Sequence, residues 1–177
     1  MSNSHTANNI EYRALTVSYH AQVKRLFTPV GVIPIFTINS TTFDAPTKAK
    51  ALWDTGAALT CIRPALFQHI KLPLLGAIGL TTITGVGGKV EAPAILVNLF
   101  ITSTLVIESC PAFILDLPKN IDVIIGMDVI GMGDFVVCNA NNKTSFSFAI
   151  PPFPDKIDLA DRANAINELN KKRAEER

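Results

Sequence analysis

Short runs of apolar and β-branched residues, separated by turn-forming residues, fill most of the sequence between positions 30 and 150. Such runs favour strands, and their regular spacing between Gly, Pro, Asn and Asp is typical of an all-β domain. Gly85, Gly87 and Gly88 supply the backbone freedom of a tight hairpin turn. We therefore predict strands over 30–38, 48–54, 60–62, 90–102, 105–115, 121–125, 135–138 and 144–150.

Two short helices interrupt these strands. Pro64 begins the first, which runs to His69, because proline fits the first turn of a helix. Gly126 precedes the second, which ends near Gly131 or Gly133. The core of the fold is thus predicted to consist of strands, with one or two short helices.

The two ends of the chain differ from this core. Residues 12–27 have no clean period and fit either a short helix or a strand that pairs with a partner. The prolines in 151–154 break the pattern, and apolar residues recur at helical spacing over 155–177. We divide the chain into a leader (1–28), a strand-rich domain (29–150) and a proline-rich hinge with a C-terminal helix (151–177).

Composition supports a globular domain with appendages. The 177 residues are 48% apolar and 18% charged, which allows a sizeable core. A net charge of +1 argues against nucleic acid as the main partner. No apolar run is long enough to span a membrane, and the polar first nine residues lack the apolar core of a signal peptide.

The cysteines and histidines point to no metal or disulfide framework. Cys61, Cys110 and Cys138 are far apart, and each stands in apolar sequence, so we expect buried thiols in a reducing compartment, the cytoplasm. The histidines have no metal-ligand spacing. We predict no metal and no cofactor.

Asp54 is the strongest candidate for chemistry. An apolar segment leads up to this one carboxylate, and Thr55 and Gly56 turn the chain back into apolar sequence. Partial burial of an ionised carboxylate is costly without a partner. The chain holds no second Asp-Thr-Gly or Asp-Ser-Gly, so a like partner would have to come from a second molecule. The plain alternative is an Asp that shapes a turn in an ordinary β domain.

Three segments in this order resemble the retropepsin-like aspartic proteases. Asp54-Thr55-Gly56-Ala57 resembles the catalytic loop of that family, the glycine-rich segment 81–90 resembles its flap hairpin, and 123–130 resembles the segment that supports the loop. The resemblance covers roughly 29–150 and favours a cellular or bacterial type over a retroviral one. It implies an all-β fold, a closed barrel with short helices, to which this chain adds a C-terminal helix.

The resemblance also implies an activity and a partner. In that family two carboxylates share one proton around one water, and in a homodimer both would be Asp54. The expected function is an aspartic endopeptidase that cleaves extended, apolar peptide segments of peptide or protein substrates. The residues carried over are Asp54, Thr55 and Gly56 (catalytic loop), Ala57, Ala58, Gly85, Val86, Gly87 and Gly88 (substrate binding), and Ile124, Ile125 and Gly126 (structural support).

Two positions depart from the retroviral pattern. Ala58 stands where those enzymes have an acid, and Met127 stands where they have an arginine, so both halves of their ion pair are replaced together. Loss of a whole buried pair can be neutral, whereas loss of one half is costly. Asp128 is predicted to cap the helix that follows.

Two rival interpretations remain open. A catalytically silent module could keep this fold and serve for dimerisation or peptide binding. Alternatively, the leader or the C-terminal helix could cover the cleft until it is removed. For the glycines of 85–88, a plain hairpin turn is as good an interpretation as a substrate lid.

Overall fold

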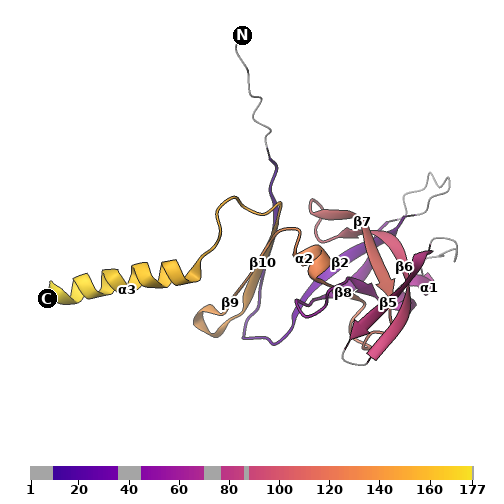
Figure 1. Ribbon diagram of the computed structural model, residues 1–177, viewed down its shortest axis with the longest axis horizontal. Helices are drawn as coiled ribbons and strands as arrows, with labels where there is room; N and C mark the ends of the chain where they lie inside the picture. The colour runs from indigo at the N-terminus through magenta and orange to yellow at the C-terminus, as the bar shows by residue number, and fades with distance from the viewer. Residues whose placement is uncertain (1–9, 36–44, 70–76, 86–87, 177) are drawn as a thin grey trace, which may run out of the picture.

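The computed structural model describes residues 10–35, 45–69, 77–85 and 88–176. The described chain forms a β barrel, a small second sheet beside it, and a helix that extends away from both (Figure 1). The predicted all-β class with short helices and a C-terminal helix is confirmed.

Six strands close the barrel. In their hydrogen-bonded order these are β2 (Leu26–Pro34), β3 (Thr47–Trp53), β8 (Val123–Ile125), β4 (Cys61–Ile62), β7 (Val106–Ile114) and β6 (Gly88–Phe100), and pairing between β2 and β6 completes the ring. A seventh strand, β5 (Ala77–Gly85), pairs with β6 beyond the ring. Closure leaves these six strands with few free edges, which protects a small all-β domain from edge-to-edge association.

Strands β3 and β8 run parallel, and this pairing positions the candidate site. Trp53 is opposite Ile125 in the register, so the next residues, Asp54 and Gly126, leave the sheet at the same edge. The Asp54 backbone N–H donates to the Ile125 carbonyl over 3.0 Å and extends the pairing by one residue. Two segments about 70 residues apart in the chain therefore meet where Asp54 begins its turn.

The second sheet has the order β1 (Arg13–Ser18), β10 (Ser145–Ile150) and β9 (Asp134–Cys138). Of the two alternatives for the N-terminal segment, the structure shows a strand, and its partner β10 belongs to the same chain. The predicted division at residue 28 remains a prediction.

Aromatic packing joins the second sheet to the barrel directly behind the site. Trp53 is 4% exposed, and its ring stacks on Phe135 at 5.5 Å and contacts Phe146 and Phe148. Its indole N–H donates to the Thr28 hydroxyl over 2.9 Å, so the buried polar atom is satisfied. Residue 53 thus anchors the strand end from which Asp54 emerges.

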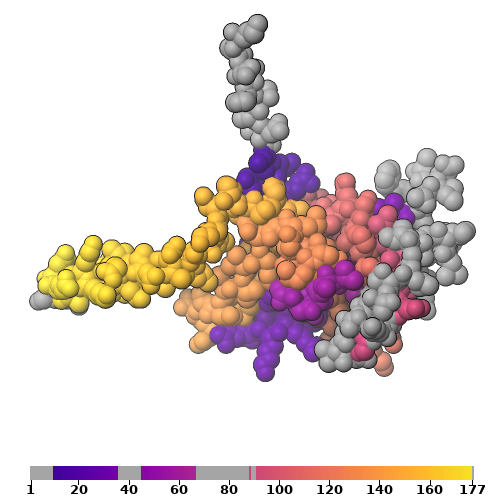
Figure 2. Space-filling model, viewed as in Figure 1, coloured from indigo at the N-terminus to yellow at the C-terminus, as the bar shows by residue number. Residues whose placement is uncertain are grey.

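The helices α1 (Pro64–His69) and α2 (Met127–Ile130) and the 3₁₀ turn η2 (Ala140–Asn142) are short, whereas α3 (Leu159–Glu175) is long and has no buried residue. The Asp158 side chain caps α3 by accepting the N–H groups of Ala160 and Asp161. Figure 2 shows α3 projecting from the body of the molecule. Within the described residues, no helix is long and apolar enough to cross a membrane.

The cysteines follow the prediction only in part. Cys61 and Cys110 are buried free thiols. Burial, with a smaller contribution from the Asp128 charge, raises the pKa of Cys61 to about 11 and the pKa of Cys110 to about 12. The prediction was wrong for Cys138, which is exposed because β9 is an edge strand and Cys138 is its last residue.

Candidate active site

The turn after β3 holds the Asp54 side chain in a defined orientation. Asp54 is half-buried, and its carboxylate Oδ1 accepts the Gly56 N–H over 2.9 Å. The Ala57 N–H donates to the Asp54 carbonyl over 3.1 Å and closes the turn. One carboxylate oxygen is therefore fixed by the loop backbone, and no cation within 4 Å pairs with the carboxylate in the described chain.

The segment after β8 braces this loop from behind. The Met127 N–H donates to the Ala57 carbonyl over 2.8 Å, and the Asp128 N–H donates to the Ala58 carbonyl over 3.2 Å. Gly126 makes this contact possible, because a Cβ there would lie 2.6 Å from the Leu59 carbonyl carbon and oxygen. The loop and its support are thus in backbone-to-backbone contact.

Thr60 and Asp128 add a buried polar connection that the sequence did not reveal. The Thr60 N–H and hydroxyl each donate to the Asp128 carboxylate over 2.8 Å, and the Thr60 hydroxyl accepts the Gly126 N–H over 3.2 Å. The prediction that Asp128 caps α2 was wrong, since Gly126 is the N-cap. The sequence pattern carried no signal for this connection, because residues 60 and 128 lie far apart in the chain and meet only in the fold.

Replacing Thr60 by valine is expected to lower the free energy of unfolding by about 2 kcal/mol, because the Gly126 N–H and one Asp128 oxygen lose a partner inside the fold. Chemical denaturation measures this change. Thr60→Ser is the matched control: it keeps the hydroxyl and loses only a methyl group. If Thr60→Ser proved as destabilising as Thr60→Val, packing rather than hydrogen bonding would explain the role of Thr60.

A recess of about 550 Å³ opens beside Asp54. Asp54 and Thr55 line it together with apolar side chains from the β3 and β8 strands and the loop before β8. Its basic lining residues, Lys24 and Arg25, were not predicted. The lining residues in the described part of the chain are Lys24, Arg25, Leu26, Leu52, Trp53, Asp54, Thr55, Pro118, Ile121, Ile124, Phe135 and Val137.

The loop residues predicted for the site lie close to Asp54. Thr55, Gly56 and Ala58 are exposed, and Ala57 is half-buried. A Cβ on Gly56 would lie 3.1 Å from the Asp54 Oδ1 atom, so glycine keeps the space beside the carboxylate open. Ile124 lines the recess, whereas Ile125 is buried beneath it.

The predicted flap forms a hairpin of β5 and β6. Gly85 and Gly88 are paired at its end, and Gly88 has a φ of +107°, a left-handed conformation that favours glycine. Val86 and Gly87 lie outside the described residues. The hairpin geometry agrees equally with a plain turn and with a lid.

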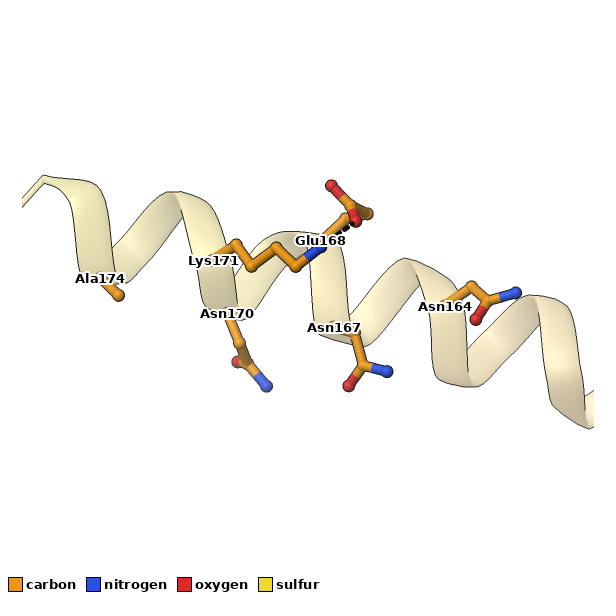
Figure 3. A pocket seen from close by; sticks show the side chains of 6 residues that line it. All are labelled: Asn164, Asn167, Glu168, Asn170, Lys171 and Ala174. Carbon is orange, nitrogen blue, oxygen red and sulfur yellow. Dashed lines mark hydrogen bonds and ion pairs between the residues drawn. The ribbon is translucent and has the colours of Figure 1, made fainter.

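A second hollow lies along α3 (Figure 3), lined by Asn164, Asn167, Glu168, Asn170, Lys171 and Ala174. All six residues come from one helix, and the Lys171 ammonium is bonded to the Glu168 carboxylate at 3.0 Å. This surface brings together no groups from different elements, so the recess at Asp54 is the better candidate. Within the described ranges, no cluster of three or more His, Cys, Asp or Glu could hold a metal ion.

The barrel, the Asp-Thr-Gly turn and the bracing segment agree with what the comparisons with known proteins found. A family model described as "Aspartyl protease" matches residues 36–129, more than half of the chain. The chain therefore belongs to the aspartyl protease family, and its fold is retropepsin-like. No curated protein sequence matches it.

One solved structure supports the fold, and two others show weaker similarity. A retropepsin-like aspartic protease from Rickettsia conorii superposes with a TM-score of 0.51 at 14% identity, covering 78% of this chain and 95% of its own. The EIAV protease gives 0.45 at 25% identity over 65% and 92% of the two chains. The Simian Foamy Virus (mac) protease gives 0.36 at 18% identity over 59% and 92%.

Proposed function

We propose that this protein is an aspartic endopeptidase that acts as a homodimer, with one Asp54 from each chain in a shared site. The observation that carries the proposal is the braced turn, which presents a single half-buried carboxylate at the edge of a recess. The sequence offers no second loop of this kind, so a pair of carboxylates requires two chains. An isologous two-fold contact brings a residue next to its own copy.

In the proposed reaction, the two Asp54 carboxylates share one proton and hold one water. The ionised carboxylate removes a proton from the water as its oxygen attacks the peptide carbonyl carbon, and the protonated carboxyl gives its proton to the carbonyl oxygen. The tetrahedral intermediate then collapses: the carboxyl that took the proton of the water gives it to the amine nitrogen, the C–N bond breaks, and a hydroxyl of the intermediate returns its proton to the other carboxylate. The Gly56 N–H keeps one oxygen of each carboxylate in place.

The proposed substrate is an extended, largely apolar peptide segment. Leu52, Ile121 and Ile124 give the recess an apolar wall. The β5–β6 hairpin would close over the peptide and add it as a strand, with Gly85, Val86, Gly87 and Gly88 at the tip. Ala57 and Ala58 are small and would border the peptide, and the exposed Thr55 would contact the opposite chain.

The experiment that tests the proposal is incubation of the protein with a complex peptide library from about pH 4 to 7, with new termini identified by mass spectrometry. A dilution series is run in parallel with light scattering. We expect cleavage whose rate per chain falls as the dimer dissociates. Peptide binding without cleavage at any pH would support the silent module, and a fully active monomer would contradict the shared site.

One rival interpretation is that the C-terminal helix covers the cleft until it is removed. Helix α3 has no buried residue and extends away from the barrel (Figure 1), so it does not cover the recess in this structure. Removal of 155–177 is therefore expected to leave cleavage unchanged.

The buried free thiols Cys61 and Cys110 support our proposal of a reducing, cytoplasmic location.

A further inference from the structure

We propose that Lys24 and Arg25 form a cationic subsite beside Asp54, which selects substrates with an aspartate or glutamate near the cleaved bond. The inference rests on the proposed function and adds a substrate class to it: an apolar segment that carries an acidic side chain. It assigns a binding role to two residues that the sequence placed in an ordinary leader.

The register of the barrel places this subsite next to the candidate catalytic carboxylate. Strand β2 begins at Leu26, which is opposite Trp53 of β3. The residues just outside that pair, Arg25 and Asp54, leave the two strands at the same edge, and both line the recess together with Lys24. An acidic substrate side chain that reaches these cations would belong to a residue close to the scissile bond.

The charge of the recess is unbalanced. Among the described residues, its lining holds two cations and one carboxylate, and the proposed reaction already uses that carboxylate. Lys24 and Arg25 are exposed, and neither takes part in the ion pairs of the described chain. Two adjacent cations without a carboxylate partner, at the rim of a peptide-sized recess, attract an anionic ligand.

Two other basic side chains near the recess, in contrast to Lys24 and Arg25, have partners within the protein. The Arg63 guanidinium lies 3.7 Å from Asp122 and also donates to the Pro118 carbonyl, and the Lys50 ammonium lies 4.4 Å from the centre of the Phe27 ring. These two basic residues thus have partners within the fold. Lys24 and Arg25 have no such structural task within the described residues.

The expected ligand is a carboxylate on a short side chain. An arginine fork can bind both oxygens of a carboxylate, and a lysine adds a point charge beside it. Leu52, Ile121 and Ile124 meanwhile receive an apolar neighbour of the acidic residue. The ion pairs between these cations and a substrate carboxylate remain partly solvated. We therefore expect each cation to raise the kcat/KM of an acidic peptide over that of a neutral one about threefold, and both together about tenfold.

The test compares peptides that differ only by Glu or Gln, placed in turn at each of the positions flanking the cleaved bond. For the wild type, Lys24→Gln, Arg25→Gln and the double variant, the ratio of kcat/KM for the Glu and Gln peptides is measured at low and high salt. Lys48→Gln is the matched control: Lys48 is an exposed lysine of β3 that does not line the recess. We expect a wild-type ratio that falls with salt, an unchanged ratio in the control, and no preference in the double variant.

Binding of the same peptides to Asp54→Asn protein, followed by fluorescence anisotropy, gives a readout that needs no cleavage. Preferential binding of Glu peptides without any wild-type cleavage would support the subsite and refute the proposed function. Cleavage and binding without preference would refute the subsite alone. Light scattering shows whether the Lys24 and Arg25 variants still form dimers. If the variants dissociate but still prefer Glu peptides, the subsite is refuted and the two cations belong to the interface between chains.

Discussion

Asp54→Asn is expected to lower the kcat for peptide cleavage by about a thousandfold or more, because the variant cannot hold or transfer the proton that the paired carboxylates share. The asparagine carbonyl oxygen can still accept the Gly56 N–H, which now meets the Asp54 Oδ1 atom at 2.9 Å. The loop geometry is therefore retained, and the variant loses the proton transfer but keeps the structure of the turn. Steady-state cleavage of a defined peptide by the purified variant measures the effect.

Two controls separate this effect from a loss of structure. Asp116→Asn, at an exposed loop position, removes the same charge and should leave both cleavage and the denaturation midpoint unchanged. In an equal mixture of wild-type and Asp54→Asn chains that exchange partners freely, each wild-type chain meets another in about half of its dimers, so activity per wild-type chain should fall by about half. Undiminished activity in that mixture would contradict a shared site.

The sequence predicted the strand-rich barrel well because its signals are local. β-branched runs bounded by turn residues specify strands whatever their partners are. Pro64 correctly marked the start of α1, and the aromatic and β-branched residues of 135–138 and 144–150 correctly marked β9 and β10. Local pattern could not identify the partner of β1, because Arg13–Ser18 pairs with residues 127 to 137 positions away.

The site was predictable only where a short motif carried it. Asp54 and Gly126 could be linked by resemblance, although no periodicity reveals that β3 and β8 run parallel and side by side. Thr60 and Asp128 escaped because a buried hydrogen bond between distant side chains leaves no pattern in the chain. Lys24 and Arg25 were not predicted, because only the β2–β3 register places them beside the recess.

The close contact between the loop and the segment after β8 leaves no room for a side chain at position 126. Gly126 is buried, its N–H is bound by the Thr60 hydroxyl, and the next two N–H groups bind the Ala57 and Ala58 carbonyls. Each of these contacts depends on the same close approach of two backbones. A side chain at position 126 would have to separate them together.

Gly126→Ala is therefore expected to lower the free energy of unfolding by about 3 kcal/mol, a large part of the stability of a domain this size. Its Cβ would meet backbone atoms of Leu59 at 2.6 Å, and backbone cannot rotate away as a side chain can. Gly56→Ala is the matched control, because its Cβ would meet only the Asp54 side chain, at 3.1 Å, and should cost under about 1 kcal/mol. Chemical denaturation of both variants measures the difference. A Gly126→Ala protein as stable as Gly56→Ala would show that the loop and the segment after β8 are not held in the close contact from which the Asp54 geometry follows.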